Sequence, residues 1–148
     1  MKSRFLMFTL MVLLAAGAAL AQEKSTPEEA KALLDKAVAE VQKDGSTKAI
    51  AKFNDPKGGF QQDDLYVFCM DSTNKISAHP DAAMRGVDAA TLKDANGKAF
   101  GTEMVAAAKK GSGTVEYMWK NPESGKVEAK VSFLKKAGDQ ACGVGAYK

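Results

Sequence analysis

The sequence predicts an α+β domain in which a long helix precedes a five-stranded antiparallel sheet. The first observation is an apolar stripe at helical spacing between residues 33 and 41, directly after strong helix-start residues. The second is the apolar run 65–70, which is typical of a strand buried on both faces. The third is that residues 114–147 divide into strand-like segments separated by short turn motifs.

The N-terminal segment predicts a secretory signal peptide. Basic residues precede an apolar run at 5–14, and Ala19-Leu20-Ala21 fits a peptidase cleavage site. The apolar run is shorter than the about 20 residues that a membrane span needs, so an uncleaved anchor is the weaker alternative. We therefore expect a signal peptide at 1–21 and a single domain at 22–148, without stable membrane insertion. Its expected location is periplasmic or secreted.

The charge balance argues against a nucleic-acid partner. The formal net charge is +3, and Lys2 and Arg4 of the predicted signal supply two of these charges. The remaining domain is near +1, with lysines scattered among acids, whereas nucleic-acid binding calls for clustered excess positive charge.

The motif content argues against an enzyme or a metal protein. A Gly-x-Ser-x-Gly elbow, a phosphate loop and a His-Glu-x-x-His motif are all missing from the sequence. One histidine and two distant cysteines lack metal-ligand spacing. We therefore expect neither catalysis nor a metal or other cofactor.

The helices are indicated by their caps and stops. Residues 25–29 combine a capping hydroxyl, a first-turn proline and two acids, which is a strong helix start. Gly45 ends this helix, and Ser46 or Thr47 begins a second short one. Turn residues at 54–59 then predict a loop.

The first two strands form a predicted hairpin. Residues 65–70 make the first strand, and residues 75–79 return as the second. A long polar connection, 80–96, follows with little periodicity. A short helix is expected at 100–110, with Gly111 as its stop.

Three further strands complete the predicted sheet, at 114–120, 127–135 and 140–147. Tyr117 and Trp119 alternate onto one face of the first of them. The last strand is rich in Gly and Ala, and such small residues leave room for other groups to lie close to the sheet.

Cys69 and Cys142 both lie in the part of the chain expected to be exported. An isolated pair in an oxidising compartment is a disulfide candidate, and it would close a loop of roughly 70 residues. The chain-entropy model values such a bridge at about 4 kcal/mol. The alternative is two buried free thiols.

Across residues 28–147, the order and spacing of several short motifs resemble the single Cache domain family. The resemblance lies in the motifs together and not in any one of them. They are Asp64-Leu65-Tyr66-Val67-Phe68, Asp71, Ile76-Ser77-Ala78-His79-Pro80, Gly86, Lys93-Asp94, Gly97-Lys98, Phe100, Tyr117-Met118-Trp119, Asn121-Pro122, Gly125-Lys126-Val127-Glu128-Ala129-Lys130 and Gly143-Val144-Gly145-Ala146-Tyr147.

The resemblance implies a PAS-like extracytoplasmic sensor fold. The long N-terminal helix would pack on one face of the sheet, and the connection after the second strand would enclose a small-ligand pocket on the other. Members of the family usually sense small organic acids or similar metabolites, mostly as the outer part of chemoreceptors or sensor kinases. This sequence shows no downstream membrane helix or signalling module, so we expect a free-standing exported member.

Two local departures from the family qualify this expectation. Phe133 occupies a position where the family often has Tyr, so a pocket here would have one hydroxyl fewer. The cysteines are not a general family feature. The resemblance would place Cys69 and Cys142 on neighbouring central strands, which favours the disulfide.

Four residues are candidate donors to an anionic ligand. His79 can donate a hydrogen bond from a pocket, although backbone partners at the edge of a core are the alternative. Tyr117 and Trp119 would form a polar-tipped wall, with plain core packing as the alternative. Lys130 sits mid-strand and would pair with the anion, unless it is simply an exposed strand lysine.

Two further residues complete the candidate ligand-binding set. Arg85 lies in the connection that would cover the pocket, where its guanidinium would suit a bidentate contact to a carboxylate. Phe68 would form the pocket floor, within a strand face that is mostly core.

These inferences favour an exported soluble binding module for a small organic acid or similar metabolite. It would act as a sensor-type domain, with a membrane receptor or sensor kinase as a candidate partner. The alternative is an interaction protein that docks on a membrane sensor or transporter without a small ligand of its own. A large exposed apolar patch would favour that alternative.

Overall fold

The computed structural model describes residues 22–148, so the predicted signal peptide at 1–21 lies outside the described residues and stays a prediction. The elements run in the order α1 (Pro27–Asp44), α2 (Ser46–Asn54), β1 (Gln61–Gln62), β2 (Leu65–Met70), β3 (Ile76–Ala78), the short 3₁₀ helices η1 (Ala82–Met84) and η2 (Ala89–Thr91), α3 (Phe100–Lys110), β4 (Ser112–Lys120), β5 (Val127–Ala137) and β6 (Gln140–Tyr147).

Helix α1 begins where the sequence predicts. Thr26 is its N-cap: the hydroxyl accepts a hydrogen bond from the Glu29 amide at 3.2 Å, and the Glu29 carboxylate accepts one from the Thr26 amide at 2.7 Å. This reciprocal capping box satisfies two donors that would otherwise lack partners. At the other end Gly45, with φ of 79°, turns the chain from α1 directly into α2.

The sheet is antiparallel, with the strand order β1-β2-β6-β5-β4 and with β3 also paired to β2. The five predicted strands are all present, and the two-residue β1 is an addition that the sequence analysis did not anticipate. It pairs with the start of β2, and β3 pairs with the end of β2. The connection expected to lack periodicity contains η1 and η2, each opened by an Asp side chain that accepts an amide hydrogen bond.

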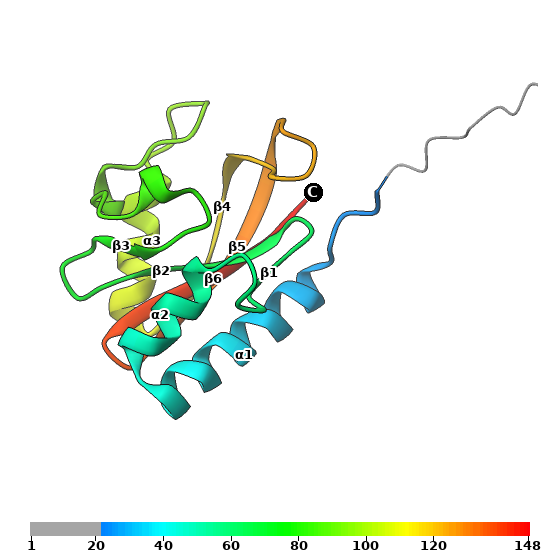
Figure 1. The fold of residues 1–148 in the computed structure, drawn as a ribbon. Coiled ribbons are helices and arrows are strands. Elements are labelled where there is room, and N and C mark those ends of the chain that lie inside the picture. The colour runs from blue at the N-terminus through cyan, green and yellow to red at the C-terminus, as the bar shows by residue number, and fades with distance from the viewer. Residues whose placement is uncertain (1–21) are drawn as a thin grey trace, which may run out of the picture.

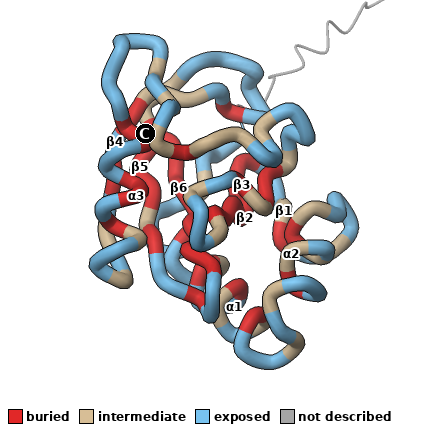
Figure 2. Tube along the Cα trace, turned by 90° about the vertical axis from the view of Figure 1, so that its left-hand side faces the viewer, coloured by how far each residue is buried: buried red, intermediate tan, exposed pale blue. Residues whose placement is uncertain are grey.

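Two apolar layers flank the sheet (Figures 1 and 2). Helix α1 packs across β5 and β6 on one face, and its buried residues include Leu34 and Val41. Helix α3 packs on β4 and β5 from the other side, with η2 beside it. All of β2 is buried, as predicted for a central strand covered on both faces. The α+β, PAS-like class expected from the sequence is therefore confirmed.

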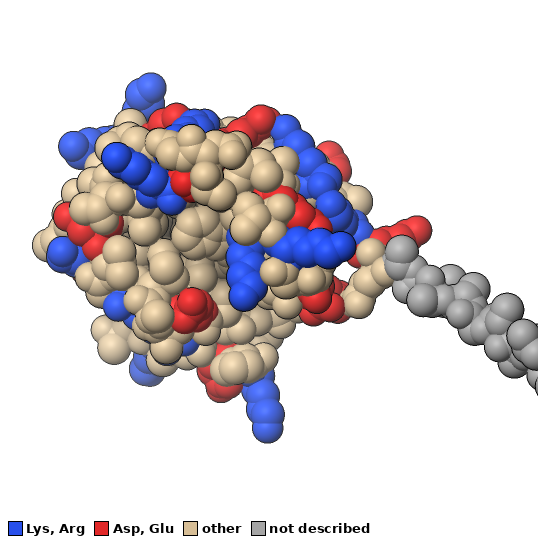
Figure 3. Space-filling view, turned by 90° about the horizontal axis from the view of Figure 1, so that it is seen from above, with Lys and Arg blue, Asp and Glu red and all other residues tan. Residues whose placement is uncertain are grey.

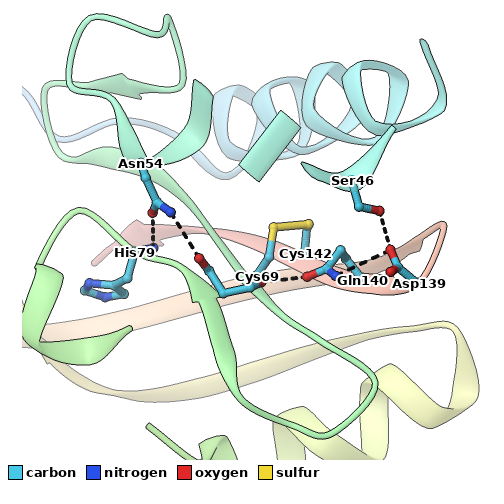
Figure 4. The surroundings of a disulfide bond; sticks show 8 residues. Ser46, Asn54, Cys69, His79, Asp139, Gln140 and Cys142 are labelled. Carbon is cyan, nitrogen blue, oxygen red and sulfur yellow. Dashed lines mark hydrogen bonds between the residues drawn. A yellow bond between two sulfur atoms is a disulfide. The ribbon is translucent and has the colours of Figure 1, made fainter. Parts of the chain in front are cut away.

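The predicted disulfide is present between Cys69 on β2 and Cys142 on β6, which are directly paired in the sheet. Both cysteines are fully buried on the α1 face (Figure 4). The alternative of two free thiols is therefore wrong.

Candidate ligand-binding site

The face of the sheet opposite α1 carries the buried amine of Lys130. Strand register places Lys130 between Tyr117 of β4 and Tyr147 of β6, so these three side chains share one face. The relative exposure of Lys130 is 1%. Among the buried side-chain nitrogen and oxygen atoms of residues 22–148, the Lys130 Nζ is the one without a hydrogen-bond partner.

Aromatic rings surround this amine in place of a counter-ion. The Lys130 Nζ lies 3.9 Å from the ring centre of Tyr66, 4.8 Å from that of Tyr147 and 6.0 Å from that of Phe68. Burial lowers the pKa of Lys130 to about 7, and the charge of Asp64 opposes this only in part. A buried amine at this pKa exchanges its proton near neutral pH.

Glycines on β6 make room for these side chains. A Cβ on Gly145 would lie 2.4 Å from the Lys130 Cε, and one on Gly143 would lie 2.4 Å from the Phe68 ring. Contacts this short are not observed in proteins, so a larger residue at either position would force these side chains to shift. The small residues predicted to leave space above this strand have that function.

His79 stands at the end of β3, beside the same group of rings. Its ring centre is 5.2 Å from that of Tyr66 and 6.5 Å from that of Trp119. The Nδ1 atom accepts a hydrogen bond from the Asp81 amide at 3.0 Å, so the neutral ring carries its proton on Nε2. Burial lowers the pKa of His79 to about 4, with the Lys130 charge as a further cause, and so the neutral form prevails at physiological pH.

An aromatic wall completes this region. The rings of Phe100 and Tyr117 are stacked at 4.2 Å, and Trp119 meets Phe100 edge-on at 5.3 Å. The Tyr117 hydroxyl is hydrogen-bonded to the Ser132 hydroxyl at 3.0 Å. Burial raises the pKa of Tyr117 well above the usual value, so the phenol stays protonated.

The cavity between these side chains is small, with a volume of about 20 Å³. It is lined by Tyr66, Phe68, Ile76, His79, Leu92, Phe100, Met104, Tyr117 and Trp119. That space holds one water molecule, whereas ligand pockets usually measure about 300–1,000 Å³. The expectation of a hollow already large enough for a metabolite is therefore wrong for this structure, because the aromatic side chains fill it. A metabolite would fit here only if some of the lining side chains moved apart.

A larger hollow of about 340 Å³ lies near the N-terminal segment, but its chemistry differs. Five carboxylates line it, against one lysine: Glu23, Asp63, Asp64, Glu123 and Glu128, with Lys24. An anionic ligand would be repelled there. The Lys130 region, where a buried amine lacks a partner, is the candidate site for an organic acid.

Comparison with known proteins identifies the family. The family model described as Single Cache domain 2 matches residues 6–146. This chain belongs to the single Cache domain 2 family.

Three solved structures have the same fold as this Cache domain. A methyl-accepting chemotaxis protein from Vibrio parahaemolyticus RIMD 2210633 superposes with a TM-score of 0.69 at 23% identity, over 81% of this chain and 86% of that one. The periplasmic sensor domain of a chemotaxis protein gives 0.60 at 24%, over 81% and 88%. A Cache chemosensory domain studied for carboxylic acid recognition gives 0.58 at 24%, over 81% and 86%.

The Cache domain brings five of the six predicted ligand residues together. His79, Tyr117, Trp119 and Phe68 line the small cavity, and Lys130 contacts its wall through Tyr66. Arg85 is placed differently: its Nε donates to the His79 carbonyl at 2.9 Å, and its Nη2 donates to the Asn54 carbonyl at 3.3 Å. The guanidinium therefore links the covering segment, residues 79–92, to α2 and does not line the cavity.

Asn54 contacts the backbone beside the candidate site, and the sequence analysis did not single it out. Its amide donates to the Ser77 carbonyl at 3.0 Å and accepts from the His79 amide at 3.0 Å. The Ser77 hydroxyl in turn donates to Gln140 at 2.6 Å (Figure 4). These hydrogen bonds tie the backbone of β3 and His79 to α2 and β6. Sequence reasoning assigned Asn54 only to a loop, because its partners are distant in the chain.

Tyr66 and Tyr147 are the other residues that sequence reasoning missed. Both rings contact Lys130, and burial raises the pKa of each phenol. The alternation of Tyr66 with Phe68 along β2 was a usable signal, since it places both on the cavity face.

Among residues 22–148 no helix is long and apolar enough to span a membrane. Lys and Arg side chains lie beside Asp and Glu on the face shown in Figure 3.

Proposed function

We propose that this protein is an exported, sensor-type Cache domain that binds a small carboxylic acid, with the ligand carboxylate paired to Lys130. The observation that carries the proposal is the fully buried Lys130 Nζ without a partner. Leaving such a donor unsatisfied is costly, so the group calls for an explanation, and a ligand that supplies the missing acceptor is the one we propose.

The chemistry of the surrounding donors supports an anion. His79 offers an N–H from Nε2, Trp119 offers its indole N–H, and Lys130 offers an ammonium when protonated. An anion entering this group would raise the pKa of Lys130, because it supplies the counter-charge that the protein lacks. Charge-assisted hydrogen bonds to the carboxylate would then offset the cost of burial.

The apolar walls support a short ligand. Phe68, Phe100 and Met104 offer hydrocarbon surface and no charge. A carboxylate with two to four carbons would place its head at Lys130 and its tail among these side chains. The carboxylic acid recognition reported for one Cache chemosensory relative agrees with this ligand class.

Calorimetry at pH 8 tests this proposal. Acetate, propionate and butyrate would be compared with the corresponding amides, which have similar shape and no charge. We expect binding of the acids alone, with uptake of up to one proton, seen by repeating the titration in buffers of different ionisation enthalpy. Lys130→Met should abolish both signals, whereas Lys136→Met, at an exposed position on the same strand, should change neither. Equal binding by the amides, or binding without proton uptake, would contradict the proposal.

The docking alternative lacks the feature that would favour it. Val127 is the one large hydrophobic residue that is exposed among residues 22–148. A single side chain is not the contiguous apolar patch that a docking surface needs. A membrane receptor or sensor kinase remains the predicted partner of the ligand-bound domain, and co-purification with such a protein tests it.

A further inference from the structure

We propose that Lys130 also captures small carbonyl compounds, namely aldehydes and 2-oxo acids, as a covalent imine, because its buried amine has no hydrogen-bond partner and is surrounded by aromatic rings. This inference rests on the proposed function, since the carbonyl compound occupies the same site. It goes beyond that function by giving the lysine a nucleophilic role as well as an electrostatic one.

The surroundings of the Lys130 amine favour its neutral, nucleophilic form. Aromatic rings pack around it, and the ion pairs found among the described residues involve other lysines. With its pKa lowered to about 7, most copies carry a free lone pair at pH 8. Asp64 favours the protonated form and is the one opposing charge; the neighbouring Tyr66 and Tyr147 stay neutral there, since burial raises their pKa.

Two hydroxyls lie on the same face of the sheet as Lys130. Tyr117 is the direct cross-strand neighbour of Lys130, and its hydroxyl lies 3.0 Å from that of Ser132. The Ser132 Oγ and the Lys130 Cε both crowd the same point above Gly145, at 2.3 and 2.4 Å from where a Cβ would stand. A serine hydroxyl therefore lies next to the carbon that bears the amine.

The step balances without any oxidant or reductant. The Nζ lone pair attacks the carbonyl carbon, the C–O π electrons move to oxygen, and one proton passes from nitrogen to oxygen to give a carbinolamine. The carbinolamine hydroxyl then takes a proton from the solvent and leaves as water while the nitrogen lone pair forms the C=N bond, and the nitrogen keeps its remaining proton as a protonated imine. With a 2-oxo acid, the ligand carboxylate neutralises the protonated imine.

The surroundings of the amine favour persistence of the adduct. Lys130 is 1% exposed and aromatic rings pack around its Nζ, so little water reaches this point. The movement of side chains that admits an acid would admit a carbonyl compound of the same size.

Reductive trapping tests the inference. The purified protein is incubated at pH 8 with pyruvate and sodium cyanoborohydride, and labelled lysines are located by peptide mass mapping. We expect one dominant adduct, on Lys130, formed at least tenfold faster than on the exposed Lys136 of the same molecule. Labels spread evenly over exposed lysines, or a Lys130 that stays unlabelled, would overturn it. The comparison within one molecule does not depend on whether a Lys130→Arg variant folds.

The test separates this inference from the function on which it rests. If carboxylates bind with proton uptake but pyruvate is not trapped at Lys130, the imine is wrong and the acid-binding function stands. If Lys130 is trapped while acetate, propionate and butyrate do not bind, the acid-binding function is wrong and the covalent site stands. If the acids bind, they should also slow the labelling, since both ligands share the site.

Discussion

Gly145 of β6 lies directly beneath the side chain of Lys130, and a Cβ at that position would come within 2.4 Å of the lysine Cε. The same Cβ would meet the Ser132 hydroxyl at 2.3 Å. The smallest residue on one strand thus determines where the amine on the next strand can lie. Both proposals depend on this buried amine, and its position depends on the neighbouring Gly145.

We expect Gly145→Ala to lower the free energy of unfolding by about 1–3 kcal/mol, because overpacking forces neighbours off their rotamers. It should also weaken acid binding, since Lys130 must shift. Urea denaturation and calorimetry measure the two effects. Gly113→Ala is the control, because its Cβ would crowd Ala107 of α3, away from the amine. A variant that loses stability and keeps full affinity would contradict this account.

The stability of the wild-type protein should rise between about pH 7 and 10.5 relative to Lys130→Met. In this window the unfolded chain holds a proton on Lys130 that the folded protein has lost, since the folded pKa is about 7 against 10.5. Below pH 7 Lys130 is protonated in both states, and burying its charge then lowers the free energy of unfolding by up to about 5 kcal/mol. Urea denaturation from pH 6 to 9.5 measures the difference. A constant gap between the two proteins would show that the pKa is not shifted.

The single histidine allows a direct titration by NMR. We expect the His79 ring to stay neutral down to about pH 5, with a midpoint near 4 instead of 6.5. Burial is the main cause and the Lys130 charge a further one, whereas Asp81 acts in the opposite direction. In Lys130→Met the midpoint should therefore move upward. A midpoint near 6.5 in the wild-type protein would place the ring in water.

His79 also makes the stability depend on pH. The unfolded chain binds a proton on His79 at a higher pH than the folded protein does, so the free energy of unfolding falls as the pH falls from about 6.5 to 4. The reduction amounts to up to about 3 kcal/mol. His79→Gln should remove this part of the acid sensitivity, and denaturation at pH 4.5 and 7 compares the two proteins. An equal loss of stability in both would contradict the assignment.

Replacing Cys69 and Cys142 together by Ala should lower the free energy of unfolding by about 4 kcal/mol, because the bridge closes a loop with a sequence separation of 73 residues. Chemical denaturation of the wild-type protein, with and without reductant, gives the same comparison without a mutation. An unfolding midpoint that neither change moves would show that the bridge does not form in solution.

Arg85→Gln should loosen the covering segment with little effect on the ligand contacts. The side chain donates to the carbonyls of His79 and Asn54, so its removal costs about 0.5–1.5 kcal/mol of local stability. Hydrogen exchange across residues 79–92 should become faster, while acid affinity changes less than about threefold. Lys93→Gln, at an exposed position in the same connection, is the control. A loss of affinity above tenfold would instead make Arg85 a ligand contact.

Local sequence signals predicted most of the fold. The Thr26–Glu29 capping box, the stop at Gly45 and the wholly apolar β2 act through neighbours in the chain or through a simple period of burial. The positions of η1, η2 and β1 escaped prediction. Each is short and depends on contacts with segments that pack against it.

The candidate site, like the fold, was only partly predictable from the sequence. His79, Trp119 and Lys130 were chosen from residue type and family resemblance, but the register that sets Lys130 opposite Tyr117, and not Trp119, could not be predicted. Nor could the different role of Arg85, since its acceptors are backbone carbonyls that any residue supplies.

The sequence by itself determined the α+β class, the central place of β2 and the set of polar residues available to a ligand, because helical and strand periodicities are local properties. Only the tertiary structure decided that Lys130 is buried without a counter-ion and that aromatic rings fill the cavity beside it. Burial and pairing depend on which strands lie side by side, and those contacts join residues far apart in the chain.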